Sequence, residues 1–227
     1  MGKYGMNSGP QGYLPLREFI CSSLAKSAKM QITPDEVLLT SGSLQAIDLV
    51  NATLLNAGDT VIVEAGNYAG ALSKLRALGV NYIGIELDQH GMKMDALETT
   101  LETLAAQNIT PKYIFTIPTV QNPTGTVMPV DRRHQMLALS KKFNVQIFED
   151  DCYADLIFDG TRPPAIHALD TENRVIYCGT FSKTIAPALR VGYRIAPWPL
   201  MGHILPLKSD AGSGALEQMT LAEYLPK

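Results

Sequence analysis

The chain is poor in cysteine and in aromatic residues. It has 3 cysteines and 1 tryptophan in 227 residues, and Phe, Trp and Tyr together make up only 7%. Cys21, Cys152 and Cys178 are odd in number and form no C-x-x-C pair, so neither a disulfide framework nor a zinc knuckle is predicted. This cysteine usage is typical of a cytoplasmic protein with reduced thiols.

A large charge of one sign and long apolar runs are also missing. The chain has 19 Lys and Arg against 22 Asp and Glu, which leaves no basic field to hold nucleic acid or an anionic membrane. The first residues carry no apolar signal segment, and no later apolar run is long enough to cross a bilayer. We therefore expect a soluble, unexported protein whose partners are neither nucleic acid nor membrane.

The chain does have a high hydrophobic content, 46%, in an alternating pattern. Its length suits one large domain, or one domain and part of another. Short β-rich runs, mostly apolar throughout as in strands buried on both faces, alternate with longer helical stretches. This pattern predicts an α/β three-layer sandwich around a mostly parallel seven-stranded sheet. The expected strands are 37–40, 60–64, 80–87, 113–117, 145–149, 174–178 and 191–195, and the expected helices are 16–29, 44–55, 69–78, 94–106 and 132–143.

Four junctions that follow predicted strands carry unusual polar residues, at 41–43, 121–125, 150–153 and 179–183. Ligands of open α/β sheets bind beyond the carboxyl ends of the strands, so these junctions should meet at one rim. At the first junction, Gly42 permits a tight turn before an apolar helix, whose free N–H groups favour an anion. An ordinary helix cap by Ser41 or Ser43 is the alternative.

The third junction places three carboxylates in succession, Glu149, Asp150 and Asp151. So much negative charge at a sheet edge needs a cation nearby. A divalent metal bound only by oxygen is one candidate, because the histidines follow no ligand spacing. In the other interpretation, Glu149 and Asp151 point to solvent or to helix ends, and one carboxylate alone is functional.

The fourth junction places Lys183 and Arg190 seven residues apart, between two apolar strands. A lysine held in an apolar crevice has a lowered pKa and can attack a carbonyl to form a Schiff base. A solvated surface lysine is the alternative, but the hydroxyl groups and the arginine around Lys183 suit a phosphate.

These motifs together carry a family resemblance. The chain has T-F-S-K at 180–183, P-x-L-R-x-G-Y at 187–193, N-P-T-G at 122–125 and E-D-D-x-Y at 149–153. In this order and spacing they resemble the pyridoxal-phosphate-dependent aminotransferases of class I/II, fold type I. The nearest branch contains 2-aminoadipate and multi-substrate aromatic aminotransferases, together with the aminotransferase-like domains of MocR-type regulators. The resemblance covers nearly the whole chain.

The resemblance implies pyridoxal 5'-phosphate as cofactor, no metal, and a role for each rim residue. Lys183 would form the Schiff base and shuttle the α-proton of the substrate, and Asp150 would pair with the pyridinium nitrogen. Asn122 and Tyr153 would donate hydrogen bonds to the phenolic oxygen of the ring, and Tyr68 would stack on the ring face. The alternatives are that Asn122 is only part of a turn and that Tyr68 is only a core aromatic. The implied phosphate ligands are Gly42, Ser43, Leu44, Thr180, Ser182 and Arg190, with Tyr4 reaching the phosphate of a neighbouring subunit in a homodimer.

The activity that the resemblance implies is amino-group transfer from an L-amino acid to a 2-oxo acid, in amino-acid metabolism. An effector domain of a MocR/GntR-type transcription regulator and a fold-type-I C–S lyase are the alternatives. Residues 1–30 would lead into the large domain, 31–200 would form it, and 201–227 would begin a helix towards a small domain. No arginine follows Arg194, so we expect the arginine that receives the substrate carboxylate in this family to be missing.

Overall fold

The computed structural model describes residues 9–158, 160–210 and 213–225, and it confirms a mostly parallel seven-stranded sheet. The strand order is β1, β9, β8, β7, β6, β2, β3. Neighbouring strands from β3 to β8 are parallel, and β9 is antiparallel to both β8 and β1. The bounds are β1 Val37–Thr40, β2 Thr60–Glu64, β3 Asn81–Ile85, β6 Tyr113–Thr116, β7 Gln146–Asp150, β8 Val175–Thr180 and β9 Gly192–Ile195.

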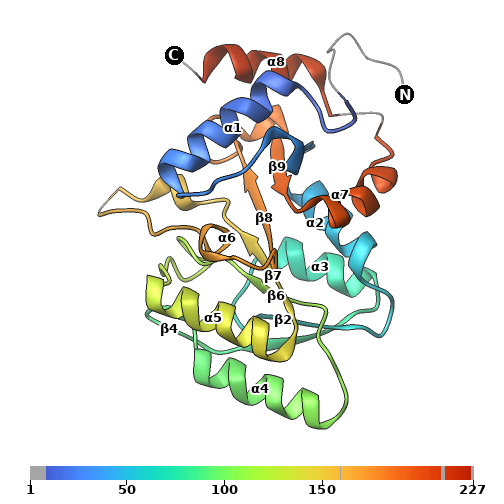
Figure 1. The fold of residues 1–227 in the computed structure, drawn as a ribbon, viewed down its shortest axis with the longest axis vertical. Helices are drawn as coiled ribbons and strands as arrows, with labels where there is room; N and C mark the ends of the chain where they lie inside the picture. Colours follow the sequence, from blue (N-terminus) through green and yellow to red (C-terminus); the bar gives the residue numbers. More distant parts are fainter. Residues whose placement is uncertain (1–8, 159, 211–212, 226–227) are drawn as a thin grey trace.

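Helices cover both faces of the sheet and complete the three predicted layers (Figure 1). Helices α1 Leu14–Ser27, α4 Met94–Ala106, α5 Val130–Phe143, α6 Ile166–Leu169 and α8 Ala215–Tyr224 pack on one face. Helices α2 Ser43–Leu54, α3 Ala69–Ala77 and α7 Trp198–Ile204 pack on the other. Short 3-10 turns lie at Pro34–Glu36, Ala154–Leu156, Pro187–Leu189 and Leu205–Leu207.

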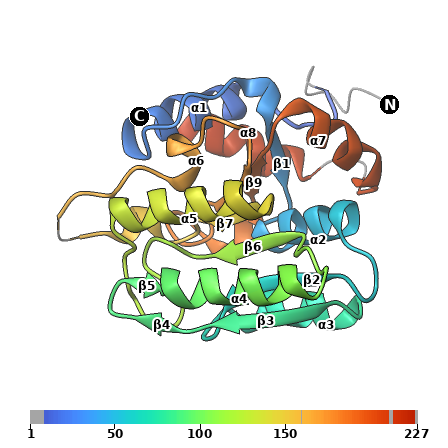
Figure 2. The same ribbon diagram turned by 60° about the horizontal axis from the view of Figure 1, so that its bottom comes forward.

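The alternation of side chains along each strand explains why both faces are apolar. In β1, Val37 and Leu39 join the core beneath α1, whereas Leu38 packs against Met201 of α7. Helices α4 and α5 lie side by side over the sheet (Figure 2) and share one core cluster. Among the described residues, none of the helices is both long and apolar enough to cross a membrane.

The structure differs from the sequence-based expectation at two elements. The run 80–87 is not one strand, because β3 ends at Ile85 and a short ribbon follows, β4 Leu87–Asp88 paired with β5 Gly91–Met92. Gln89 and His90 form the turn of this ribbon, and Gly91 begins β5 at a φ of +84°, a conformation that favours glycine. In the segment 201–227, where one helix was expected to begin, helix α7 ends at Ile204 and the separate helix α8 begins at Ala215.

The strand directions place the predicted junctions at one edge of the sheet. Because β9 is antiparallel to both of its neighbours, β1 runs in the same direction as β6, β7 and β8. The carboxyl ends of these four strands therefore point to the same side, as the sequence predicts.

Candidate active site

A cavity opens at this carboxyl edge. Nine of the twelve residues that the sequence predicts for the site line it. The full lining is Ser43, Leu44, Tyr68, Ile117, Asp150, Cys152, Tyr153, Thr180, Ser182, Lys183, Pro187 and Arg190. Of the other three, Gly42 and Asn122 each contact a lining residue, and Tyr4 lies outside the described residues.

One end of the cavity is built to receive an anion. Helix α2 begins there, directly after Gly42, and no side chain of the described residues caps it, so the interpretation as an ordinary serine cap is wrong. The Gly42 amide donates to the Thr40 carbonyl at 2.9 Å. The amides of Ser43 and Leu44, in the first turn, have no carbonyl four residues back within the helix. They and the helix dipole therefore favour a negative group at this point.

Two hydroxyl groups and a guanidinium complete this end. The Thr180 hydroxyl donates to the Ser182 hydroxyl at 3.0 Å and accepts the Ser182 amide at 3.1 Å. The exposed Arg190 side chain donates to the carbonyls of Pro187 at 3.2 Å and Ser41 at 3.5 Å. A Cβ atom at Gly42 would lie 2.2 Å from Arg190 Nη2, and the φ of +79° there also favours glycine. Glycine thus lets the arginine lie against the start of α2.

The three successive carboxylates have three different environments, and two of them are paired away from the cavity. Glu149 is buried, accepts two backbone amides at the start of α6 at 2.9 Å each, and lies 3.8 Å from Arg133 Nη1. Asp151 is also buried, and it accepts hydrogen bonds from Arg162 at 2.6 Å and from the Tyr177 hydroxyl at 3.0 Å. Neither points to solvent, and Glu149 points to a helix end, as the second interpretation allowed. In the part of the chain that the structure describes, no cluster of His, Cys, Asp or Glu could hold a metal ion.

Asp150 is the carboxylate that lines the cavity. It is 4% exposed, and its Oδ1 accepts a hydrogen bond from Cys152 Sγ at 2.7 Å. Among the described residues it has no ion pair with a lysine, arginine or histidine. Burial raises its pKa to about 6, and the contact with Cys152 opposes that rise. A buried carboxylate without a counter-ion favours a ligand that brings a positive charge.

Lys183 and Tyr153 lie together at the mouth of the cavity. Lys183 Nζ is 5.6 Å from the centre of the Tyr153 ring, and Asn122 Nδ2 donates to the Tyr153 hydroxyl at 3.1 Å. Burial raises the pKa of Tyr153, and the bond from Asn122 opposes the rise. Lys183 is exposed, so the expectation of an enclosed apolar crevice is wrong. The segment 182–190 leaves the sheet at its rim, and Lys183 goes with it.

Tyr68 reaches the cavity because of a glycine that sequence reasoning missed. Tyr68 is half-buried and its ring lies over Gly70 in the first turn of α3, where a Cβ atom would be 2.5 Å from Cζ of the ring. Cys152 was also missed as a site residue, although it occupies the variable position of the E-D-D-x-Y motif. A thiol that follows Asp150 by two residues was the available signal.

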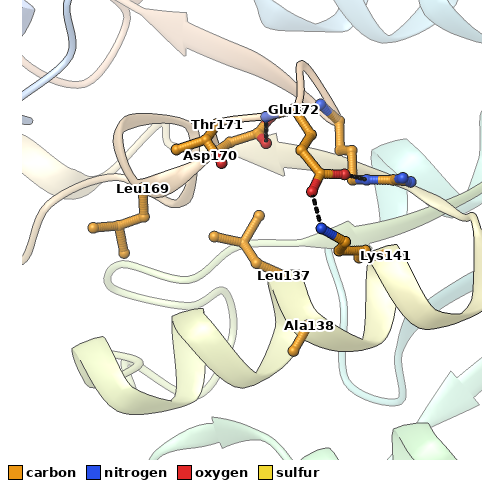
Figure 3. Close-up of a pocket in the computed structure, with 8 residues that line it drawn as sticks. Leu137, Ala138, Lys141, Leu169, Asp170, Thr171 and Glu172 are labelled. Carbon is orange, nitrogen blue, oxygen red and sulfur yellow. Dashed lines mark hydrogen bonds and ion pairs between the residues drawn. The ribbon is translucent and has the colours of Figure 1, made fainter.

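A second hollow offers no comparable chemistry. It lies between the end of α5 and the segment before β8, near the amino ends of the strands (Figure 3). There Glu172 accepts hydrogen bonds from Lys141 and from Arg174 Nε, the latter at 3.0 Å. Asp170 accepts the amides of Arg174 and Val175. These charged groups already have partners within the protein.

The comparisons with known proteins agree with this geometry. The model of the family "Aminotransferase class I and II" matches residues 4–220. The chain belongs to this family. It is 35% identical to the uncharacterized HTH-type transcriptional regulator YisV of Bacillus subtilis, over 95% of this chain and 44% of that protein. It is 33% identical to the 2-aminoadipate transaminase of Thermus thermophilus, over 99% of this chain and 55% of that protein.

A solved aminotransferase structure is also similar to this chain. The kynurenine aminotransferase of Pyrococcus horikoshii, in complex with PMP, superposes with a TM-score of 0.91 and 36% identity, over 99% of this chain and 57% of that one. The chain thus spans about half the length of the relatives it matches.

The cofactor of this family is pyridoxal 5'-phosphate, and the residues present fit it. The helix N-terminus, hydroxyl groups and Arg190 suit its phosphate. The unpaired Asp150 suits a protonated ring nitrogen, and Lys183 supplies a primary amine on the same cavity. The fit rests on three separate features of the described residues.

Proposed function

We propose that this chain is the cofactor-binding part of a pyridoxal-phosphate-dependent aminotransferase. It would transfer an amino group from an L-amino acid to a 2-oxo acid, through a Schiff base at Lys183. The observation that carries the proposal is Asp150, a buried carboxylate without a counter-ion among the described residues, in one cavity with Lys183 and a helix start that favours an anion. By family resemblance we also infer a cytoplasmic homodimer.

Each residue has a distinct task in this proposal. Bound pyridoxal phosphate supplies a ring that accepts electrons from the substrate. Asp150 holds a proton on the ring nitrogen, which keeps the ring electron-poor. Asn122 and Tyr153 supply hydrogen bonds to the phenolic oxygen. The Lys183 amine would hold the cofactor at its carbonyl carbon, with loss of water, and when free would take and return a proton at Nζ.

Covalent trapping tests this proposal. The chain is incubated with pyridoxal phosphate, reduced with borohydride, digested and analysed by mass spectrometry. We expect the reduced cofactor on Lys183, none in Lys183→Ala, and normal labelling in Lys141→Ala, a control at an exposed lysine that pairs with Glu172. A wild-type chain that takes no label at Lys183 would show that the proposal is wrong.

A second candidate function is the aminotransferase-like domain of a transcription regulator, because the chain is 35% identical to one over nearly its whole length. Such a domain would bind the cofactor without needing turnover. A third, a lyase of the same fold type, would release ammonia and pyruvate. Amino-group transfer, ammonia release and pyruvate release, measured together, separate these three functions. Only the aminotransferase gives a new amino acid from an added 2-oxo acid, only the lyase releases ammonia and pyruvate, and the regulator domain needs to do neither.

A further inference from the structure

We propose that Gln121, oriented by Glu64, is a positioning residue that holds Asn122 against Tyr153 and so sets the hydrogen bonds to the phenolic oxygen of the cofactor. This inference rests on the proposed function, because it concerns the same cofactor. Gln121 and Glu64 do not line the cavity, and the family motifs in the sequence gave neither of these two residues a role.

The side chain of Gln121 joins two segments that are far apart in the sequence. It is 2% exposed. Its Nε2 donates to Glu64 Oε2 at 3.0 Å and to the Gly66 carbonyl at 2.6 Å, both at the end of β2. Its Oε1 accepts the amide of Thr124 at 2.8 Å and the Thr124 hydroxyl at 2.7 Å, both in the turn after β6. All of its hydrogen-bonding positions are used.

Glu64 determines which way this amide points. It is buried, and its Oε1 accepts the Thr116 hydroxyl at 2.7 Å and the Ile117 amide at 3.1 Å. When ionised, Glu64 can only accept, so the NH₂ group of Gln121 faces Glu64 and its carbonyl faces the turn. Burial raises the pKa of Glu64 to about 7, while the donors Thr116, Gln121 and Ile117 oppose the rise and the charge of Asp150 adds to it.

The turn needs this support because its backbone is strained. Val120 has a φ of +54°, a left-handed conformation that β-branched residues rarely adopt and that only tight surroundings maintain. The Gln121 amide donates to the Thr126 carbonyl at 2.9 Å, and Gly125 donates to the Gln121 carbonyl at 2.6 Å. Arg133, in α5, donates to the carbonyls of Pro118 and Met128, which lie before and after the turn in the chain.

The consequence reaches the cavity through the next residue. Asn122 follows Gln121 directly, and its Nδ2 donates to the Tyr153 hydroxyl at 3.1 Å. The Gly66 carbonyl, held by the same glutamine, lies two residues before Tyr68. One buried side chain therefore links the segments that carry Asn122 and Tyr68.

The test uses Gln121→Met, which keeps the size of the side chain and removes its hydrogen bonds. Two quantities are measured: the dissociation constant for pyridoxal phosphate, and the pH at which the absorbance of the Lys183-bound cofactor changes. We expect about five- to tenfold weaker binding, as for one or two lost hydrogen bonds. The pH midpoint should move upward, because losing donors to the phenolic oxygen disfavours its anion. Asn122→Ala should shift both quantities in the same direction.

The double variant of Gln121→Met with Asn122→Ala separates positioning from general stability. If Gln121 acts through Asn122, the double variant should match Asn122→Ala alone within error, and the two changes should not add. The control is Gln218→Met. Gln218 is an equally buried glutamine that bonds the Ser213 carbonyl and the Tyr13 amide, away from the cavity. It should lower the melting temperature and leave the pH midpoint unchanged.

Should Gln121→Met fail to fold, Glu64→Gln carries the test. Its oxygen can still accept from Thr116 and Ile117, while its NH₂ group would face that of Gln121 and release the turn. We expect the same upward shift of the midpoint. A wild-type midpoint in the folded variants, or additive effects with Asn122→Ala, overturns the positioning role while the proposed function stands. A wild-type chain that takes up no cofactor overturns both.

Discussion

Replacing Asp150 by asparagine is expected to change stability and cofactor binding in opposite directions. Without cofactor, the buried Asp150 carboxylate has no cation among the described residues, so its charge destabilises the fold. With cofactor, the same charge pairs with the ring nitrogen. Asparagine keeps the shape and can still accept the hydrogen bond from Cys152, so the substitution removes little besides the charge.

The size of this destabilisation follows from the pKa of Asp150. Burial, opposed by the bond from Cys152, raises the pKa of Asp150 from 3.8 to about 6, which at about 1.4 kcal/mol per pH unit corresponds to about 3 kcal/mol. The unfolded chain releases this proton near the lower value and the folded chain near the higher one. The destabilisation is therefore absent below the lower pKa, grows as the pH rises between the two, and is complete above the higher pKa. Asp150→Asn should stabilise the cofactor-free chain by up to about 3 kcal/mol at neutral pH.

Urea unfolding of wild type and Asp150→Asn, without cofactor and at pH values below and above this interval, measures the effect. Asp151→Asn is the matched control, because it would leave the guanidinium of Arg162 without its buried partner and should destabilise. With cofactor, we expect Asp150→Asn to lower turnover by roughly two to four decades, the loss of about 3–5 kcal/mol from a buried charge pair. A variant less stable than wild type at neutral pH, or a pH-independent difference, would refute the reasoning.

Two further substitutions test other parts of the structure. Arg194 is 0% exposed, its Nε and Nη1 have no hydrogen-bond partner among the described residues, and burial lowers its pKa to about 9, so its charge destabilises the fold below that pH. Arg194→Met should raise the melting temperature by about 2–4 °C, and a lower melting temperature would contradict this. Gly70→Ala would place a Cβ atom 2.5 Å from Cζ of the Tyr68 ring. It should move the ring and weaken cofactor binding about tenfold, although alanine favours the helix, and an unchanged dissociation constant would show that the ring is not needed.

Local patterns in the sequence were sufficient for the sheet and the rim of the site. Continuous apolar runs gave the seven strands, and the polar residues after four of them gave the edge at which Asp150, Thr180 and Lys183 meet. Both signals depend only on neighbours in the chain: the apolar run of a strand buried on both faces, and the turn chemistry at its end. The ribbon at 87–92 was missed because its strands, of two residues each, are too short to form such a run.

Only the tertiary structure decided which groups face one another. The sequence shows three adjacent carboxylates. In the structure, Glu149 pairs with Arg133 of α5 and Asp151 pairs with Arg162. Of the three, Asp150 alone lines the cavity. Gln121 and Glu64 are 57 residues apart and meet because β2 and β6 are neighbours in the sheet. Residue type and spacing therefore determined the family and the kind of site. Partner choice among buried polar groups depends on distances across the sheet, which no local pattern in the sequence encodes.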